Sequence, residues 1–250
     1  MTEAQRMEQE ESGAPWYWRP VNLFDRTEPD VRREFFARSA VREYARGEHV
    51  FLADDAAERV FYLLDGMVKI EHISPAGQST IFWFCVPGDL FGAGGITGSV
   101  RQSVYARATE PSRALVLQRR QFEALILAYP VLGLNVIRLM GSRLRLACDS
   151  MAEVSQRASL RVGRVILRLA ESCGQWTDQR EVALKARISH QEIADMVGCT
   201  RQTVTEVLQG ICQRGILRVE KRIIHICDID QLRQCVEEAE FHDGGNLFPQ

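Results

Sequence analysis

Residues 188–217 restrict what this chain can fold into more than any other stretch, because their pattern predicts two short helices joined by a tight turn. Ser189 and Glu192 have the spacing of a capping box, in which each side chain satisfies a free backbone N–H at a helix start. Gly198 supplies the left-handed conformation of a sharp turn, and Thr200 is a good N-cap for the second helix. At helical spacing, that helix then buries Val204, Val207, Leu208 and Ile211.

The other face of the second helix is polar. It carries Arg201, Gln202, Thr205 and Glu206. Arginine can donate two hydrogen bonds to guanine, and glutamine can pair with adenine. The stretch therefore predicts a helix-turn-helix whose second helix reads the major groove. The alternative is a helical hairpin whose charged face is only solvated.

The residues that follow predict a wing beside this motif. Apolar runs at 216–219 and 223–226 flank a polar turn, which favours a β-hairpin with Lys221 and Arg222 at its tip. Two cations placed there would rest on DNA phosphate.

Composition places the chain among ordinary globular proteins. Its 250 residues, 46% hydrophobic and 26% charged, suffice for two domains with their own cores. The seven cysteines are scattered without a C-x-x-C pair, which favours reduced thiols in a cytoplasm. We find neither a signal peptide nor an apolar run of the roughly 20 residues that cross a bilayer. The prediction is a cytoplasmic protein with no membrane segment.

The first half of the chain has the pattern of a small antiparallel barrel or roll. Short apolar runs between 41 and 117 are broken by turn signals about every ten residues. Strands on either side of Asp65-Gly66 predict a hairpin. Residues 81–86, IFWFCV, predict a strand buried on both faces.

A glycine-dense segment at 87–103 interrupts this pattern. Closely spaced glycines let backbone N–H groups converge on a ligand, often an anion. The segment is the best candidate for a small-molecule pocket, with Gly92, Ala93, Gly94 and Gly95 at its centre. A structural loop that binds nothing is the equally weighted alternative.

From residue 131 the period becomes helical. Apolar residues alternate steps of three and four, as in a two-stranded coiled coil, which predicts a homodimer. The seam consists of Ile137, Met140, Leu144, Ala147, Met151 and Val154. A dimer would read a palindrome whose half-sites lie about one helical turn apart. The alternative is that this face packs on the chain's own barrel.

The predicted fold is α+β: an antiparallel, jelly-roll-like β-roll, a long dimerisation helix and a C-terminal winged helix-turn-helix. The predicted divisions are a disordered extension at 1–20 with the aromatic patch PWYWRP, the roll at 21–130, the dimerisation helix at 131–156, the winged domain at 157–232 and an acidic tail at 233–250.

With these parts in sequence, the chain resembles the CRP/FNR family of bacterial transcription regulators. The resemblance covers about residues 40 to 230 and rests on VFYLLDGMVK at 60–69, Gly77, PGD at 87–89, FG at 91–92 and SHQEIADMVGCTRQTV at 189–204. It implies a cyclic-nucleotide-binding-like β-roll, a dimer helix and a winged helix. The helix-turn-helix is locally similar to the cyanobacterial nitrogen-control branch.

The resemblance implies roles in DNA binding. Arg201 would read a base, while Ser189, His190 and Thr200 would contact phosphate, with Gln191 in the same motif. Where the cyclic-AMP receptor branch has glutamate and arginine, this chain has Gln202 and Glu206. We therefore expect a different half-site.

The sensor departs further from the cyclic-AMP-binding members. Ala93-Gly94 replaces their Glu-Leu, and Gln102-Ser103 replaces their Arg-Ser. Loss of the arginine removes the strongest available phosphate clamp, so cyclic AMP is an improbable ligand. A carboxylate effector would need an arginine, for which Arg143 and then Arg101 are the candidates.

Other cofactors find little support, and the effector stays unknown. No cysteine precedes Cys85, so the N-terminal iron–sulfur cluster of some members is excluded. Cys85, His49 and His72 could ligate haem in principle, yet each is more often an ordinary residue. Regulation by protein abundance alone is a further alternative.

The predicted function is a homodimeric regulator that binds a pseudo-palindromic operator in double-stranded DNA and contacts RNA polymerase. The alternative is a ligand-binding module whose helix-turn-helix docks on a protein. An enzyme is not expected, because the sequence has no metal-ligand cluster, P-loop or nucleophile motif.

Overall fold

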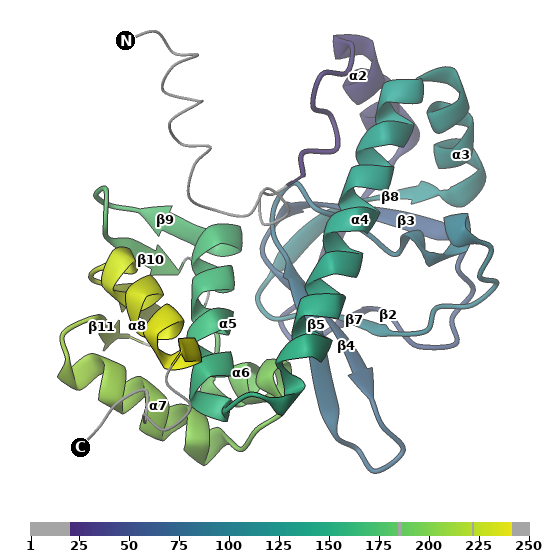
Figure 1. The fold of residues 1–250 in the computed structure, drawn as a ribbon. Coiled ribbons are helices and arrows are strands. Elements are labelled where there is room, and N and C mark those ends of the chain that lie inside the picture. The colour runs from purple at the N-terminus through teal and green to yellow at the C-terminus, as the bar shows by residue number, and fades with distance from the viewer. Residues whose placement is uncertain (1–20, 185–186, 222, 242–250) are drawn as a thin grey trace, which may run out of the picture.

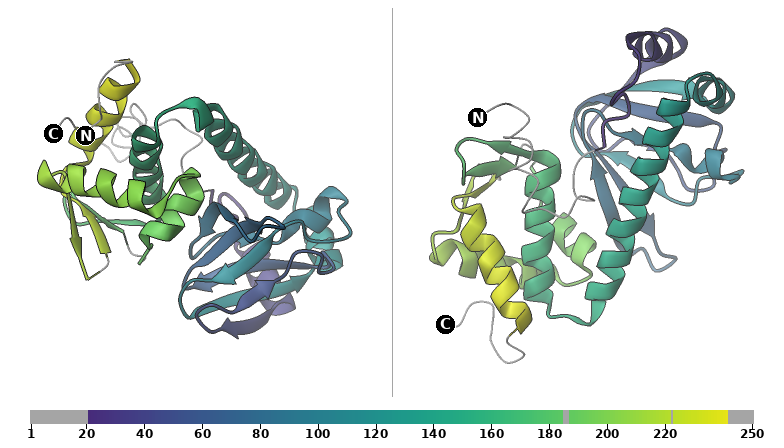
Figure 2. Two further views of the ribbon diagram at one scale, coloured as in Figure 1. Left: turned by 90° about the horizontal axis from the view of Figure 1, so that it is seen from below. Right: turned by 45° about the horizontal axis from the view of Figure 1, so that its top comes forward.

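The computed structural model describes residues 21–184, 187–221 and 223–241, which form two domains joined by a long helix (Figure 1). The predicted aromatic patch, Arg222 and the end of the acidic tail lie outside the described residues. Two further views show the β-roll on one side of the long helix and a helical domain on the other (Figure 2).

The N-terminal domain is the predicted antiparallel roll, built from two four-stranded sheets. The first has the order β1-β8-β3-β6 and the second the order β2-β7-β4-β5. The core between them includes Phe61, Leu63, Val68 and Ile70. The strands are β1 (Ala40–Tyr44), β2 (His49–Phe51), β3 (Arg59–Asp65), β4 (Val68–Ile73), β5 (Ser79–Cys85), β6 (Leu90–Phe91), β7 (Tyr105–Ala108) and β8 (Ser112–Gln118).

The hairpin predicted at Asp65-Gly66 is wrong. β3 pairs with β6 and β8, whereas β4 pairs with β5 and β7, so the two strands belong to different sheets. Gly66 has φ 84° and turns the chain from one sheet into the other. The signal of a tight turn was correct, but it cannot distinguish a hairpin from a corner of the roll.

The prediction that residues 81–86 are buried on both faces is also wrong. β5 is the edge strand of its sheet, and Phe82 is 40% exposed there. A bulge opposite Ile70 and Glu71 brings Ile81 and Phe84 onto the outer face of the sheet, where the second domain buries them.

Three helices cover the roll and lead out of it. They are α2 (Pro29–Arg38), α3 (Arg119–Ala128) and α4 (Pro130–Ala152), and the single 3-10 turns are η2 (Ala93–Thr97) and η3 (Glu153–Ser155). α4 buries Leu132, Val136 and Leu139 against the roll. Asn135, also buried, donates to the carbonyls of Leu23 and Asp25 at 3.0 and 2.8 Å and so fixes the N-terminal segment.

The C-terminal domain is a winged helix-turn-helix. Its elements are α5 (Ala158–Cys173), β9 (Gly174–Trp176), β10 (Val182–Leu184), α6 (His190–Val197), α7 (Arg201–Gln213), β11 (Leu217–Glu220), β12 (Ile223–Ile226) and α8 (Ile229–Phe241). The boundary predicted at 232 is wrong, because α8 continues to Phe241. Cys235 and Val236 are buried, and this apolar face continues the helix into the residues predicted to form the acidic tail.

The helical domain packs onto the outer face of the second sheet of the roll. Met67, Ile81 and Phe84 share one apolar cluster with residues of α5, α6 and α7. Met196 on α6 packs against that cluster. In the described residues no single helix is long and apolar enough to span a membrane; α3 and α4 together pass that test by length and composition but are bent by 117°.

Gly66→Ala should destabilise the protein more than Gly47→Ala does. Both glycines have positive φ, but a Cβ at Gly66 would overlap Ser112 and Pro111, whereas one at Gly47 would meet nothing. Overpacking of this kind costs about 1–3 kcal/mol beyond the shared backbone strain. Urea unfolding of both variants measures the difference, and equal losses would contradict a crowded corner at Gly66.

Candidate functional site

The first helix of the motif is fixed by the predicted capping box. The backbone N–H of Ser189 donates to Glu192 Oε2 at 2.9 Å, and the backbone N–H of Glu192 donates to Ser189 Oγ at 3.2 Å. Gly198, at φ 71°, ends the helix with its N–H on the carbonyl of Ala194. The local sequence alone therefore fixes both ends of α6.

The second helix presents the predicted base-reading face to solvent. Thr200 Oγ1 accepts from the N–H of Thr203 at 3.1 Å and caps α7. Arg201, Gln202 and Glu206 are exposed. Gln202 Nε2 donates to Glu206 Oε1 at 2.9 Å, so the amide would have to leave that partner before it could pair with a base.

Two of the residues predicted to contact DNA, His190 and Thr205, contact each other between α6 and α7. Thr205 Oγ1 lies 2.9 Å from His190 Nδ1 and donates to the carbonyl of Arg201 at 2.9 Å. Burial, followed by the Arg201 charge, lowers the pKa of His190. The lowered pKa favours the neutral ring, which joins the start of α6 to α7 through its contact with Thr205.

The wing is present as predicted. β11 and β12 pair from Leu217↔Ile226 to Glu220↔Ile223. Lys221 is exposed at the tip with φ 49°. The helix-turn-helix and its wing thus expose Arg201, Gln202 and Lys221, while Arg222 lies outside the described residues.

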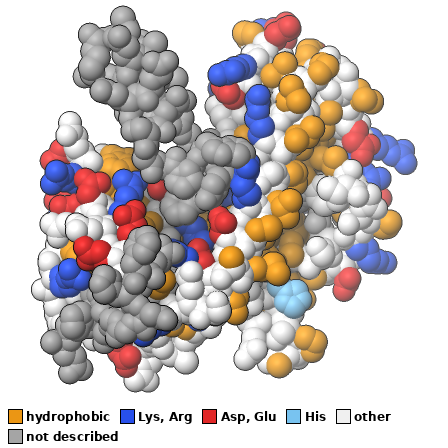
Figure 3. Space-filling view, viewed as in Figure 1, with side chains coloured by type: hydrophobic (Ala, Val, Ile, Leu, Met, Phe, Trp, Pro, Cys, Tyr) orange, Lys and Arg blue, Asp and Glu red, His pale blue; other side chains and the backbone are white. Residues whose placement is uncertain are grey.

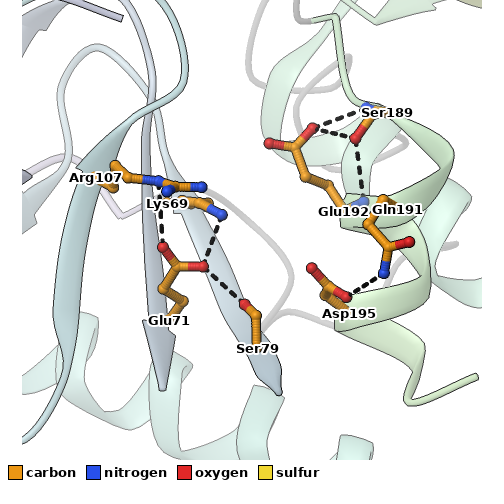
Figure 4. Close-up of polar contacts among 8 residues, drawn as sticks. All are labelled: Lys69, Glu71, Ser79, Arg107, Ser189, Gln191, Glu192 and Asp195. Carbon is orange, nitrogen blue, oxygen red and sulfur yellow. Dashed lines mark hydrogen bonds and ion pairs between the residues drawn. The ribbon is translucent and has the colours of Figure 1, made fainter. Parts of the chain in front are cut away.

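The start of α6 faces the roll across a hollow of about 620 Å³, which we call the basic cleft. Figure 4 shows Ser189, Gln191, Glu192 and Asp195 on one side and a charged cluster of the roll on the other. The cations that line the cleft are Arg46, Lys69, Arg107, Arg187 and Arg201.

The roll's side of the basic cleft is a buried ion cluster around Glu71. Lys69 Nζ lies 2.7 Å from Glu71 Oε2, and Arg107 Nε lies 3.5 Å from Glu71 Oε1. Ser79 Oγ donates to the same carboxylate at 2.7 Å. Lys69 and Glu71 are 3% and 1% exposed. The amino-acid sequence gives no signal for this cluster, because alternating polar residues on a strand predict only a solvated face.

Neighbouring protein atoms fill much of the space around the glycine-dense segment. A Cβ at Gly95 would overlap the carbonyl of Ala57, and one at Gly92 would crowd the Phe61 ring. Beside Ala93 and Gly94, the buried Gln102 donates to the carbonyl of Gly92 at 3.3 Å. Arg101 donates to the carbonyl of Asp54 at 2.6 Å, and Ser103 is exposed. These contacts favour the structural-loop interpretation.

Arg143 lies elsewhere, at a cavity between the two domains. Its guanidinium is 3.2 Å from Asp89 Oδ2 and 5.0 Å from the centre of the Trp83 ring. The cavity, of about 120 Å³, is partly open to solvent and lined mainly by β5, α4, α5 and Met196, and we call it the Trp83 cavity. The structure brings Arg143 to Asp89 at the start of the glycine-dense segment, but the candidates Gly92 to Gly95 and Arg101 to Ser103 do not line this cavity. The pattern of residues 81–86 gave no signal for the cavity, because its other wall is distant in sequence.

The predicted dimer seam is exposed on α4. Ile137, Leu144, Met151 and Val154 are each between 65% and 75% exposed, and Ala147 is exposed as well. Met140 is half-buried against the roll. Hydrophobic side chains run along this helix on the visible face (Figure 3). The alternative that the seam packs on the chain's own roll does not hold for the exposed members.

The candidate haem ligands do not converge. Burial raises the pKa of the Cys85 thiol to about 12, so it stays protonated inside the roll. His49 and His72 are exposed on β2 and β4. Among the residues that the structure describes, no three of His, Cys, Asp or Glu are grouped to hold a metal ion.

Comparisons with known proteins match both domains. Residues 41–129 match the cyclic nucleotide-binding domain, and residues 160–235 match the Crp-like helix-turn-helix domain. The chain is 26% identical over 215 residues to the CRP-like cAMP-activated global transcriptional regulator of Mycobacterium tuberculosis, covering 85% of this chain and 95% of that one. It is 29% identical over 191 residues to the global nitrogen regulator of Nostoc, covering 74% and 84%.

A similar fold occurs in solved structures. FixK2 from Bradyrhizobium japonicum superposes with a TM-score of 0.70 at 22% identity, over 78% of this chain and 96% of that one. A roll, a long helix and a helix-turn-helix in this order define a transcription regulator with a DNA-binding domain. The chain belongs to the CRP/FNR family, whose members are regulators and not enzymes.

One titration at the Trp83 cavity should change stability with pH. Burial raises the pKa of Glu171 from 4.5 to about 7, although Arg233 and Arg168 oppose the shift. A raised pKa means that the folded state prefers the proton. Stability should therefore be full below pH 4.5 and should fall as the pH rises through about 7.

Urea unfolding of the wild type and of Glu171→Gln across this range measures the effect. The wild type should lose up to about 3 kcal/mol relative to the variant, since one pKa unit corresponds to about 1.4 kcal/mol. Parallel pH profiles for the two proteins would contradict the burial of an ionisable Glu171.

Proposed function

We propose that the protein is a homodimeric transcription regulator that reads a pseudo-palindromic operator with α7. The carrying observation is the exposed start of α7, where Arg201 and Gln202 project from a helix that Thr200 and His190 hold in place. Arg201 contacts a guanine and Gln202 another base, while Ser189, Gln191, Thr200 and Lys221 lie toward the phosphates.

DNA binding requires the basic cleft to widen. Ser189, His190, Gln191 and Arg201 line it together with cations of the roll. A hollow of about 620 Å³ has the size of a small-molecule site and is too small for a duplex. The arrangement described here is therefore a docked form, and the DNA-bound form has α6 lifted from the roll.

The dimer forms through α4. Its exposed apolar seam has the spacing of a coiled coil, and a partner helix would remove Ile137, Leu144 and Met151 from water. Dimerisation also sets the distance between two reading helices, which a two-fold operator requires.

Bound at an operator in the bacterial cytoplasm, the dimer contacts RNA polymerase, and a small-molecule effector adjusts its affinity for DNA. Cyclic AMP is not that effector, because Ala93 and Gln102 stand where the charged anchors of cyclic-AMP-binding relatives are expected.

A gel-shift series in rising salt separates this function from docking on a protein partner. A protein that neutralises several phosphates loses DNA affinity steeply with salt. We expect a shift on sequences selected with the purified protein and a steep salt slope. Absence of a shift on every selected sequence would favour the protein-docking alternative.

Arg201→Ala should cost about 1–3 kcal/mol of binding free energy at the selected operator and relax the preference at one base position. Arg201→Lys keeps the charge but loses the bidentate fork, so it should restore affinity for random DNA more than specificity. Gln209→Ala, farther along the same helix, is the control. An equal loss on all sequences would make Arg201 a phosphate contact.

Leu144→Asp should convert the dimer into a monomer, because it places a charge in the middle of the apolar seam. Leu127→Asp is the matched control, since Leu127 is 83% exposed on α3. Sedimentation velocity distinguishes the two masses. A dimer that survives Leu144→Asp would refute the seam.

A further inference from the structure

The Trp83 cavity is walled by both domains. The roll and α4 contribute Trp83, Asp89 and Arg143, and the helical domain contributes Val165, Leu169, Glu171 and Met196. A molecule bound there touches both domains at once. It therefore changes the free energy of the docked form and leaves the open form unaffected.

The charged groups of the cavity are satisfied with one exception. Arg143 is paired with Asp89, and Arg168 is paired with Glu153 at 3.0 Å. Glu171 is paired through Oε1 with Arg233 at 3.5 Å, but its buried Oε2 has no hydrogen-bond partner. A buried carboxylate oxygen without a donor costs free energy, and a ligand donor would recover it.

The remainder of the lining is mainly aromatic and aliphatic. It includes Phe84, Val86, Leu139 and Leu146. A dry apolar cavity of about 150 Å³ holds one benzene ring, so about 120 Å³ suits a compact single ring. A further anion is disfavoured because Glu171 and Asp89 already lie there, and a further cation is disfavoured by Arg143, Arg168 and Arg233.

We propose that the Trp83 cavity binds a small, neutral, planar molecule of about one aromatic ring that carries an N–H or O–H donor. The donor pairs with the Glu171 carboxylate, which turns its buried Oε2 to the cavity wall when the ligand binds, and the ring lies among Trp83, Leu169 and Met196. This site is separate from Gly92 to Gly95, the centre of the glycine-dense segment. Its regulatory consequence rests on the proposed DNA-binding function: the ligand holds the docked form and weakens DNA binding.

Aniline and toluene test the ligand site, because they have nearly the same shape and only aniline has a donor. Calorimetric titration uses the full-length protein at pH 8. Aniline should bind saturably and at least tenfold more tightly than toluene. Glu171→Leu should reduce that ratio to below threefold, whereas Glu181→Gln, outside the cavity, should keep it.

Ser150→Leu provides a second variant that leaves Glu171 in place. Ser150 lines the cavity, and its Oγ bonds only to the carbonyl of Leu146 in the hydrogen bonds that the structure describes, so the larger side chain fills the space. This variant should bind neither probe. Equal binding of aniline and toluene to the wild type, or undiminished aniline binding to Ser150→Leu, would overturn the site.

The proposed effect of the ligand on DNA binding is tested separately. Saturating aniline should weaken operator binding by the wild type at least fivefold, and operator DNA should weaken aniline binding by the same factor. Operator binding by Ser150→Leu should not respond to aniline. If aniline leaves the affinity of the wild type for the operator unchanged, the proposed regulation is wrong. If the protein binds no DNA at all, the proposed function is wrong, and the calorimetric titrations still test whether the cavity binds a ligand.

Discussion

The contact between α6 and the outer face of the second sheet determines how the two domains lie. Isolated ions are costly to bury, and Lys69 and Glu71 are buried because they neutralise each other, with Arg107 and Ser79 supplying further contacts. Beside them, Met67, Ile81 and Phe84 join the apolar core of the helical domain. Both the basic cleft and the Trp83 cavity exist only because this contact brings their two walls together.

This contact places the DNA-reading surface in competition with the roll. The start of α6 and Arg201 line the basic cleft, while Gln202 and Glu206 lie open to solvent. The cations of the roll that face the cleft repel Arg201, whereas Glu192 and Asp195 of α6 line the same cleft and attract them. Opposing charge interactions of this kind, beside an apolar contact, suit a domain that must undock to bind DNA.

α4 belongs both to the roll and to the proposed dimer interface. Its buried side, with Leu132, Asn135 and Leu139, belongs to the roll, and its exposed side carries the seam. The same helix supplies Arg143 and Ser150 to the Trp83 cavity. The Trp83 cavity and the proposed dimer interface therefore share one helix.

Much of the fold could be predicted because its signals are local. The capping box at Ser189, the turn at Gly198 and the wing all depend on residues a few positions apart, and the structure confirms them. The hairpin at Gly66 and the doubly buried strand at 81–86 were wrong, because a turn signal carries no information on which strands pair. The domain boundary predicted at 232 was wrong, because burial of Cys235 and Val236, and not the acidic composition nearby, decides how far α8 extends.

The amino-acid sequence by itself determined the family, the helix-turn-helix and the residues that project from α7, because spacing along a helix fixes which side chains share a face. Only the tertiary structure decided that the Lys69–Glu71 pair of β4 meets Arg107 of β7 beneath α6, and that Glu171 meets Trp83 and Arg143 across a cavity. Those neighbours come from separate elements, and long-range packing brings them together.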